Sequence, residues 1–315
     1  QLDSPLLAIR ALACAAEHQT EQVNAIAGEF DRREGDAAAR AWAPLLRAVW
    51  AVYRAGGVVA GTSAGAAIMS STMFRDAPDV LSVLKGQLRP GQEVGPGLGF
   101  MGTQLFVDQH FLKRGRIGRT LPLMRSQGYV LGLGVEENSA AVLHGNTVQI
   151  LGRALLVNLA DARSDAGLDV FNLTDVRVSL LGSGDSLQLP DGQITPSLAK
   201  RKGQVLDPTA PGLKPYFIEA LPFYVDMLGD NVISTAMGQL IDASANELRG
   251  IAFRLDPAAG DPLGTLGFEF ILRKGLGSMG WTTEDGRGED YTVRDLRLQV
   301  RPIRMAQPTY TPWAR

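Results

Sequence analysis

Apolar residues in the first part of the chain recur at the spacing of an amphipathic helix. This pattern predicts helices over the Ala-rich residues 6–29 and over residues 42–53, and Gly56 is placed to end the second helix. The β-branched run at residues 57–61 predicts a short buried strand, and residues 64–73 predict a further helix. Helices that alternate with short buried strands are typical of an α/β fold.

The middle of the chain continues with strand-sized apolar runs. Residues 105–111 and 129–135 predict two buried strands on either side of a helix at residues 121–127. Residues 140–143 and 147–151 then flank a short polar turn, which is a hairpin signal. The pattern up to residue 189 therefore predicts a mostly parallel sheet flanked by helices.

The character of the chain changes after residue 189, where Pro, Gly and Asp become frequent. A helical pattern runs over residues 214–246, and alternating strands follow, such as residues 268–272 and 296–300. We therefore expect a catalytic α/β domain over residues 1–189 and an appended α+β extension over residues 190–315.

The composition of the chain argues against several classes of function. A net charge of -2 argues against a broadly basic nucleic-acid-binding protein. The apolar runs are strand-sized, so we expect no membrane span. Cys14 is the one cysteine and so forms no internal disulfide, and with three scattered histidines it offers no metal-ligand cluster. We expect no metal and no cofactor.

The run Gly61-Thr62-Ser63-Ala64-Gly65 matches G-x-S-x-G, a motif that places a serine on a tight turn between a strand and a helix. Its glycines let the backbone cross itself, and the helix start supplies N–H groups to an oxyanion. The predicted strand before Ser63 and the predicted helix after it provide this context. The alternative is a serine that caps a helix.

A serine nucleophile needs a general base, which is usually a histidine. His18 lies in the first predicted helix, and His144 lies in the predicted hairpin turn, where a structural role suffices. His110 ends a predicted strand, and α/β sheets assemble their sites at strand ends. His110 is therefore the candidate base.

A carboxylate should orient the imidazole. Glu136 and Glu137 follow the next buried strand, and because neighbouring residues of an extended segment point in opposite directions, we expect one of them to face His110. Asp108 shares a strand face with His110, although its spacing suits substrate contact better.

Three arginines follow the candidate base closely, namely Arg114, Arg116 and Arg119. A guanidinium group matches a carboxylate in shape and charge, so these residues could bind an acidic substrate. The alternative is a solvated basic turn.

Three runs together resemble the cyanophycinases of the S51 serine peptidase family, over about residues 40–190. They are Gly61-Thr62-Ser63-Ala64-Gly65-Ala66-Ala67, Asp108-Gln109-His110-Phe111 through Arg119, and Gly132-Leu133-Gly134-Val135-Glu136-Glu137-Asn138. The C-terminal extension makes the chain similar to the longer, exported bacterial members. This similarity implies a secreted or periplasmic enzyme, with a cytoplasmic location as the alternative.

The resemblance implies a fold like that of class I glutamine amidotransferases, a homodimer, and a Ser-His-Glu triad of Ser63, His110 and Glu137. It implies that the Ala64 N–H serves the oxyanion hole. The implied substrate-binding residues are Asp108, Gln109, Arg114, Arg116 and Arg119. The family substrate is cyanophycin, a poly-aspartate chain with arginine on each side-chain carboxyl, and the product is the β-aspartyl-arginine dipeptide.

The sequence departs from the family pattern upstream of the serine. A Gly-rich first strand and a Gly-Gly-Asp-Gln-like turn are expected there, and residues 1–55 contain neither. Two alternatives therefore stand beside a cyanophycinase. One is another S51 peptidase that cleaves aspartyl or isoaspartyl dipeptides, and the other is an inactive homologue that binds the polymer.

Overall fold

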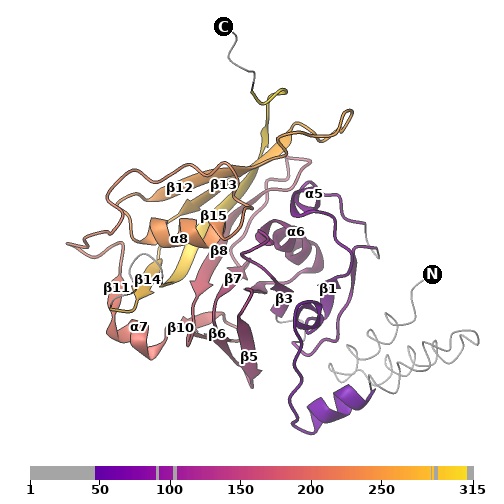
Figure 1. Ribbon diagram of the computed structural model, residues 1–315, viewed down its shortest axis with the longest axis vertical. Coiled ribbons are helices and arrows are strands. Elements are labelled where there is room, and N and C mark those ends of the chain that lie inside the picture. Colours follow the sequence, from indigo (N-terminus) through magenta and orange to yellow (C-terminus); the bar gives the residue numbers. More distant parts are fainter. Residues whose placement is uncertain (1–46, 90–91, 102–104, 285, 287–289, 311–315) are drawn as a thin grey trace, which may run out of the picture. The chain divides into compact units, whose positions relative to one another are not determined.

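The computed structural model describes residues 47–89, 92–101, 105–284, 286 and 290–310. The chain forms two compact units, drawn together in Figure 1. The first unit comprises Gln1–Ala77 and Leu88–Gln109, and the second comprises Pro78–Gln87 and His110–Arg315. The helix predicted for residues 6–29 lies outside the described residues.

The first unit combines a helix at residues 47–54 with short elements. These are α4 (Ala64–Ala67), β1 (Thr72–Phe74), β2 (Val94–Pro96) and β3 (Leu105–Gln109). Strands β1 and β2 pair in antiparallel fashion. Trp50 from the first helix stacks on Phe100 with ring centroids 4.3 Å apart, and Leu98 completes this small core. The helical pattern seen at residues 42–53 is confirmed over its described part.

Two expectations around the serine are wrong. Residues 57–61 form no strand, and Val58 is 90% exposed, because an apolar run becomes a strand only where another strand bonds to it and none does so among the described residues. The helix predicted for residues 64–73 ends at Ala67. It ends early because the loop after β2 takes up the next carbonyls, with the Leu98 N–H donating to the Ile68 C=O at 2.6 Å.

A large sheet dominates the second unit, in the order β11-β14-β15-β8-β7-β4, with β13 beside β15 and β12 beside β13. Its strands are β4 (Leu131–Val135), β7 (Ala154–Asn158), β8 (Leu173–Leu181), β11 (Gln204–Leu206), β12 (Glu247–Ala252), β13 (Leu266–Arg273), β14 (Met279–Thr282) and β15 (Tyr291–Arg304). Helices flank it, which confirms the α/β class.

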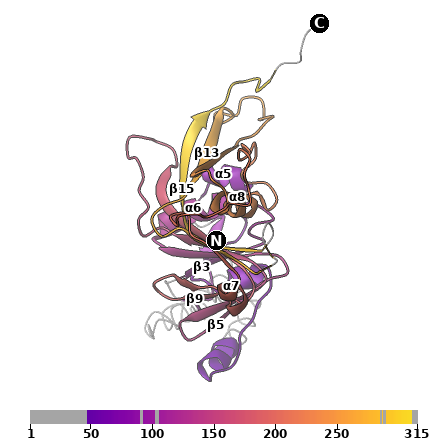
Figure 2. The same cartoon turned by 90° about the vertical axis from the view of Figure 1, so that its left-hand side faces the viewer.

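The described residues of the second unit also form a smaller sheet and four helices. The smaller sheet has β5 (Ala140–His144), β6 (Thr147–Leu151), β9 (Ser186–Gln188) and β10 (Gln193–Thr195). The helices are α5 (Val80–Leu84), α6 (Ile117–Gln127), α7 (Leu198–Lys202) and α8 (Val232–Ile241). Figures 1 and 2 show the smaller sheet at one end of this unit and β13 with β15 at the other. The predicted β5–β6 hairpin is confirmed.

The expected parallel order is not found among the ladders that join the strands of this unit. Strands β4, β7, β8, β15 and β13 pair with one another in antiparallel fashion. A parallel pair needs a long crossover, usually a helix, between its strands. Strand β7 leads to β8 through residues 159–172, which contain no helix, so the chain returns in the opposite direction.

The predicted extension is continuous with this sheet. Strand β15 pairs directly with β8, so strands from both sides of the predicted boundary at residue 189 share one sheet. The strands predicted at residues 268–272 and 296–300 lie in β13 and β15. The helix predicted over residues 214–246 is shorter and corresponds to α8, because Pro215 and Pro222 disfavour helix before it.

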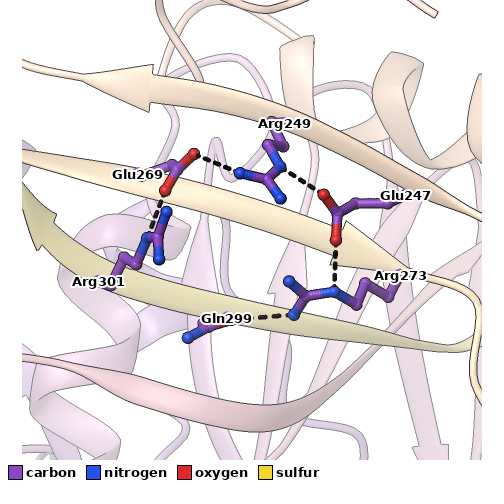
Figure 3. Close-up of polar contacts among 6 residues, drawn as sticks. All are labelled: Glu247, Arg249, Glu269, Arg273, Gln299 and Arg301. Carbon is purple, nitrogen blue, oxygen red and sulfur yellow. Dashed lines mark hydrogen bonds and ion pairs between the residues drawn. The ribbon is translucent and has the colours of Figure 1, made fainter.

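Paired charges cover one face of β12, β13 and β15 (Figure 3). Glu269 accepts hydrogen bonds from Arg249 and Arg301, and Glu247 accepts from Arg249 and from Arg273, the latter at 2.6 Å. Ile271 lies on the same face of β13 as Glu269 and Arg273, yet it is only 1% exposed. The aliphatic stems of the arginines therefore cover this face of the sheet around Ile271.

We expect this charge network to lose strength in acid. Burial acts to raise the pKa of Glu247, but hydrogen bonds from Arg249 and Arg273 outweigh it, so the pKa lies below its ordinary value of 4.5. Such a group stabilises the fold above its unfolded pKa, and this stabilisation is lost as the pH falls through the folded pKa. Glu247→Gln should lower the free energy of unfolding by about 0.5 kcal/mol at pH 7, since solvent screens the half-exposed arginines.

The measurement is urea unfolding of both proteins at pH 7 and at pH 3, with the exposed Glu219→Gln as the matched control. The difference between wild type and Glu247→Gln should be smaller at pH 3 than at pH 7, because Glu247 takes up a proton as the pH falls through its folded pKa. A difference of equal size at both pH values would contradict the prediction.

Candidate active site

Ser63 occupies a strained turn directly before α4. Its backbone has φ 52° and ψ −119°, a combination that residues with a Cβ rarely adopt. A Cβ on Gly61 would lie 2.2 Å from the Gly65 carbonyl oxygen, so only glycine fits at the first position of the motif. The Ser63 side chain is exposed at this turn. An exposed hydroxyl on a strained turn is the geometry that the G-x-S-x-G motif predicts.

The backbone after Ser63 closes a single helical turn. The Gly65 N–H donates to the Thr62 C=O at 2.8 Å, and the Ala66 N–H donates to the Ser63 C=O at 2.9 Å. Ala64 is the first residue of α4, so its N–H belongs to the helix start, where backbone donors lack partners within the helix. This position suits a donor to an oxyanion.

His110 and Glu137 are in direct contact within the second unit. His110 follows β3, Glu137 follows β4, and the distance between His110 Nδ1 and Glu137 Oε1 is 2.8 Å. When Nδ1 carries the proton that is donated to Glu137, the lone pair of the imidazole lies on Nε2. The imidazole side chain is 25% exposed and the carboxylate 36%, so the pair borders solvent. The arrangement presents an oriented base.

The two consecutive glutamates have different partners. Glu136 accepts hydrogen bonds from the backbone N–H groups of Leu112 and Lys113, the second at 3.0 Å. Glu137 turns to His110 instead, as the alternation of an extended segment predicts. The third candidate acid, Asp108, accepts from the N–H of its neighbour Gln109 at 2.9 Å and is 1% exposed. Glu136 thus holds the backbone beside His110, a role that the sequence analysis missed.

Two glycines of β4 make room for the elements that carry the site. A Cβ on Gly134 would lie 2.0 Å from the Phe111 ring, and a Cβ on Gly132 would lie 2.4 Å from Met124 Sδ in α6. The Phe111 N–H donates to the Val135 C=O at 3.3 Å, which ties the residue after His110 to the end of β4. The alternation of glycine with Leu and Val in residues 131–135 was the sequence signal for this close packing.

The remaining predicted site residues differ in exposure. Arg114 is exposed, whereas Arg116 and Arg119 are 8% and 9% exposed at the start of α6. Gln109 at the end of β3 is half-buried. Arg114 is therefore the one of the three guanidinium groups that is open to a ligand from solution.

His144 is not part of this arrangement. His144 is exposed at the end of β5, where it faces Thr147 across the hairpin, in agreement with a turn role. His18 and Cys14 lie outside the described residues. Among the described residues there is no group of three or more His, Cys, Asp or Glu side chains that could hold a metal ion. Within the same part of the chain, no helix has the length and apolar character that a bilayer crossing requires.

An exposed serine on a strained turn and an imidazole oriented by a carboxylate are features of hydrolases, and comparison with known proteins points to the same class. A cyanophycinase of Synechococcus elongatus is 27% identical over 159 residues, which cover 45% of this chain and 45% of that protein. A cyanophycinase of Geminocystis herdmanii is 28% identical over 152 residues, covering 45% of this chain and 54% of that protein.

A cyanophycinase of a Nostoc species gives a similar match, 28% over 151 residues, covering 44% of this chain and 48% of that protein. The chain thus spans about half the length of the curated relatives that it matches. No protein-family model matches it. The similarities support a relationship between this chain and the cyanophycinases of the S51 family.

The Phe111–Gly134 contact can be tested by adding one methyl group. Gly134→Ala should lower the free energy of unfolding by about 1–3 kcal/mol, because the new Cβ overlaps the Phe111 ring. Phe111→Leu should make the same substitution less costly, since a smaller side chain leaves room for it. Urea unfolding of the two single variants and the double variant measures this coupling. Equal costs in both backgrounds would show that the overlap is not the cause.

Proposed function

We propose that this chain is a serine-type peptidase that hydrolyses cyanophycin to β-aspartyl-arginine dipeptides, with Ser63 as nucleophile, His110 as base and Glu137 as the orienting acid. The observation that carries the proposal is the 2.8 Å contact between His110 Nδ1 and Glu137 Oε1. The strained turn at Ser63 and the similarity to proteins named cyanophycinase support it.

In the proposed mechanism the Ser63 hydroxyl attacks the scissile carbonyl carbon while His110 Nε2 takes its proton. The Ala64 N–H stabilises the oxyanion, and Glu137 stabilises the imidazolium that forms. His110 then protonates the leaving amine, and an acyl-enzyme remains on Ser63. Water, activated by His110, adds to the acyl carbon, and the Ser63 hydroxyl is restored as the dipeptide carboxylate leaves.

The proposed substrate carries both carboxylates and guanidinium groups. The exposed Arg114 suits its carboxylates. The family resemblance adds Asp108, Gln109, Arg116 and Arg119 to the proposed pocket. An aspartyl or isoaspartyl dipeptidase of the S51 family would use the same nucleophile. Assays of cyanophycin beside short aspartyl and isoaspartyl peptides separate the two. Homodimer formation and a place outside the cytoplasm belong to the same proposal, and they rest on the family resemblance alone.

A chain that binds the polymer without cleaving it is the second candidate. One observation favours it: the segment before Ser63 joins no strand among the described residues, and Val58 is 90% exposed there. A nucleophile turn is ordinarily held by a strand in a sheet. Labelling with a fluorophosphonate probe discriminates, because only an activated serine reacts with it.

Replacement of the nucleophile is the direct test. Ser63→Ala should lower kcat for cyanophycin by about 10⁴-fold or more, because the acyl-enzyme cannot form. Binding of the polymer, measured by co-sedimentation with cyanophycin granules, should persist. The neighbouring Thr62→Ala is the matched control, since it removes a hydroxyl that the mechanism does not use. Hydrolysis by Ser63→Ala at the wild-type rate would end the proposal.

The two adjacent glutamates allow a matched test of the orienting acid. Glu137→Gln should lower kcat by about 10²–10⁴-fold, because a neutral amide does not stabilise the imidazolium. Glu136→Gln should lower it by less than about tenfold, since the amide oxygen still accepts from the Leu112 and Lys113 N–H groups. Steady-state kinetics on cyanophycin measure both. Equal losses in the two variants would argue against the assignment of Glu137.

A further inference from the structure

The residues after His110 form a loop whose backbone is held from two sides. On one side Glu136 accepts from the Leu112 N–H, and the Val135 C=O accepts from the Phe111 N–H. On the other side the Leu112 C=O accepts from the Asn231 N–H at 3.0 Å. Both backbone polar groups of Leu112 are therefore bonded, one to the strand end that carries Glu137 and one to a segment of the C-terminal region.

That segment, residues 226–231, touches the loop at further points. Gly115 has φ +53°, and a Cβ there would lie 2.0 Å from the Leu228 carbonyl oxygen. The Leu228 side chain packs on Gly118, where a Cβ would lie 3.0 Å from Leu228 Cδ2. The Lys113 ammonium lies 2.8 Å from the Asp230 carboxylate. This hydrogen-bonded pair raises the pKa of Lys113 and lowers that of Asp230.

The segment is itself fixed to the rest of the second unit. The Met227 N–H donates to the Ile251 C=O of β12 at 2.8 Å, and the Met227 side chain is fully buried. Asn231 has φ 57° and precedes α8, and its carbonyl accepts from the Ser234 and Thr235 hydroxyls at 2.9 and 3.0 Å. Residues 226–231 thus offer the loop a rigid surface anchored in both a strand and a helix.

We propose that residues 226–231 act as a brace that positions the His110 imidazole for proton transfer. The inference rests on the proposed function, in which His110 is the general base. His110 itself has φ 46°, and its carbonyl accepts from the Arg114 N–H at 3.2 Å, so its backbone belongs to the braced turn. Displacement of that turn moves the His110 ring out of the orientation that the proposed mechanism needs. It also shifts the backbone of Arg114, whose exposed side chain is long enough to adjust. The residues of the brace are positioning residues, since none of them is part of the proposed triad.

A pair of glycine substitutions isolates the brace. Gly115 and Gly128 flank α6 and both have positive φ, +53° and +77°, so an alanine is strained at either position. A Cβ at residue 115 collides with the Leu228 carbonyl, whereas a Cβ at residue 128 meets nothing within 4 Å. Gly115→Ala should lower kcat by about tenfold or more and change KM by a smaller factor, because a small misplacement of a catalytic group is costly whereas the exposed Arg114 side chain can adjust. Gly128→Ala should retain both constants within about threefold.

Hydrogen exchange followed by mass spectrometry or NMR tests the brace without reference to activity. In the wild-type protein the Asn231 amide should exchange as slowly as the amides of α8, and Gly115→Ala should speed its exchange by about tenfold or more while Gly128→Ala does not. This measurement also holds if Gly115→Ala folds poorly, because its first part uses the wild type.

An Asn231 amide that exchanges at the rate of an unstructured peptide would overturn the proposal. Wild-type kcat in Gly115→Ala would overturn it as well. Failure of the proposed function gives a different result, in which the wild type neither cleaves cyanophycin nor labels at Ser63 while the exchange pattern stays as expected.

Discussion

The contact of the Phe111 ring with the bare backbone of Gly134 is the constraint on which the rest of the site depends. It brings the residue next to His110 against the strand that ends in Glu136 and Glu137. Any side chain at residue 134 occupies the space of the ring, so the strand end and the histidine loop approach each other only because this position is a glycine. The hydrogen bond from the Phe111 N–H to the Val135 carbonyl then fixes the position of the loop along the strand end. The two carboxylates that follow have different roles. One holds the backbone, and the other orients the imidazole.

Sequence reasoning succeeded where local pattern alone decides the structure. The hairpin of β5 and β6 has a turn between two alternating runs, and β4 is a short apolar run that is buried throughout. It failed where pairing between distant segments decides. The β-branched run before Ser63 has strand propensity, yet it becomes no strand because no neighbour bonds to it among the described residues. Likewise, the apolar pattern of a strand does not reveal whether the neighbouring strand runs parallel or antiparallel to it. In the large sheet β4 pairs with β7, and β7 with β8, in antiparallel fashion, whereas parallel pairs were expected.

In the candidate site, too, local pattern predicted some contacts, whereas contacts between distant segments were not predicted. The expectation that one of two adjacent glutamates would face His110 followed from the geometry of an extended chain, and the structure has Glu137 in contact with the ring. The hydrogen bonds that Glu136 accepts from two backbone N–H groups depend on how the loop after His110 folds back. The local sequence pattern does not predict the shape of that loop. The contacts from residues 226–231 were still harder to foresee, because they join segments far apart in the chain. The charge network over Ile271 is similar, since it needs the register of three strands to place each arginine beside its glutamate.

The hydrogen bond from the Asn231 N–H to the Leu112 carbonyl also determines when, during synthesis of the chain, the loop after His110 can complete its folding. A ribosome produces the histidine loop long before it produces the segment that supports it. The loop can reach its final shape only after synthesis has passed α8 and the strand to which the segment is tied. A nascent chain therefore contains His110 early, but the loop around His110 gains its full set of contacts only once β12 has been made.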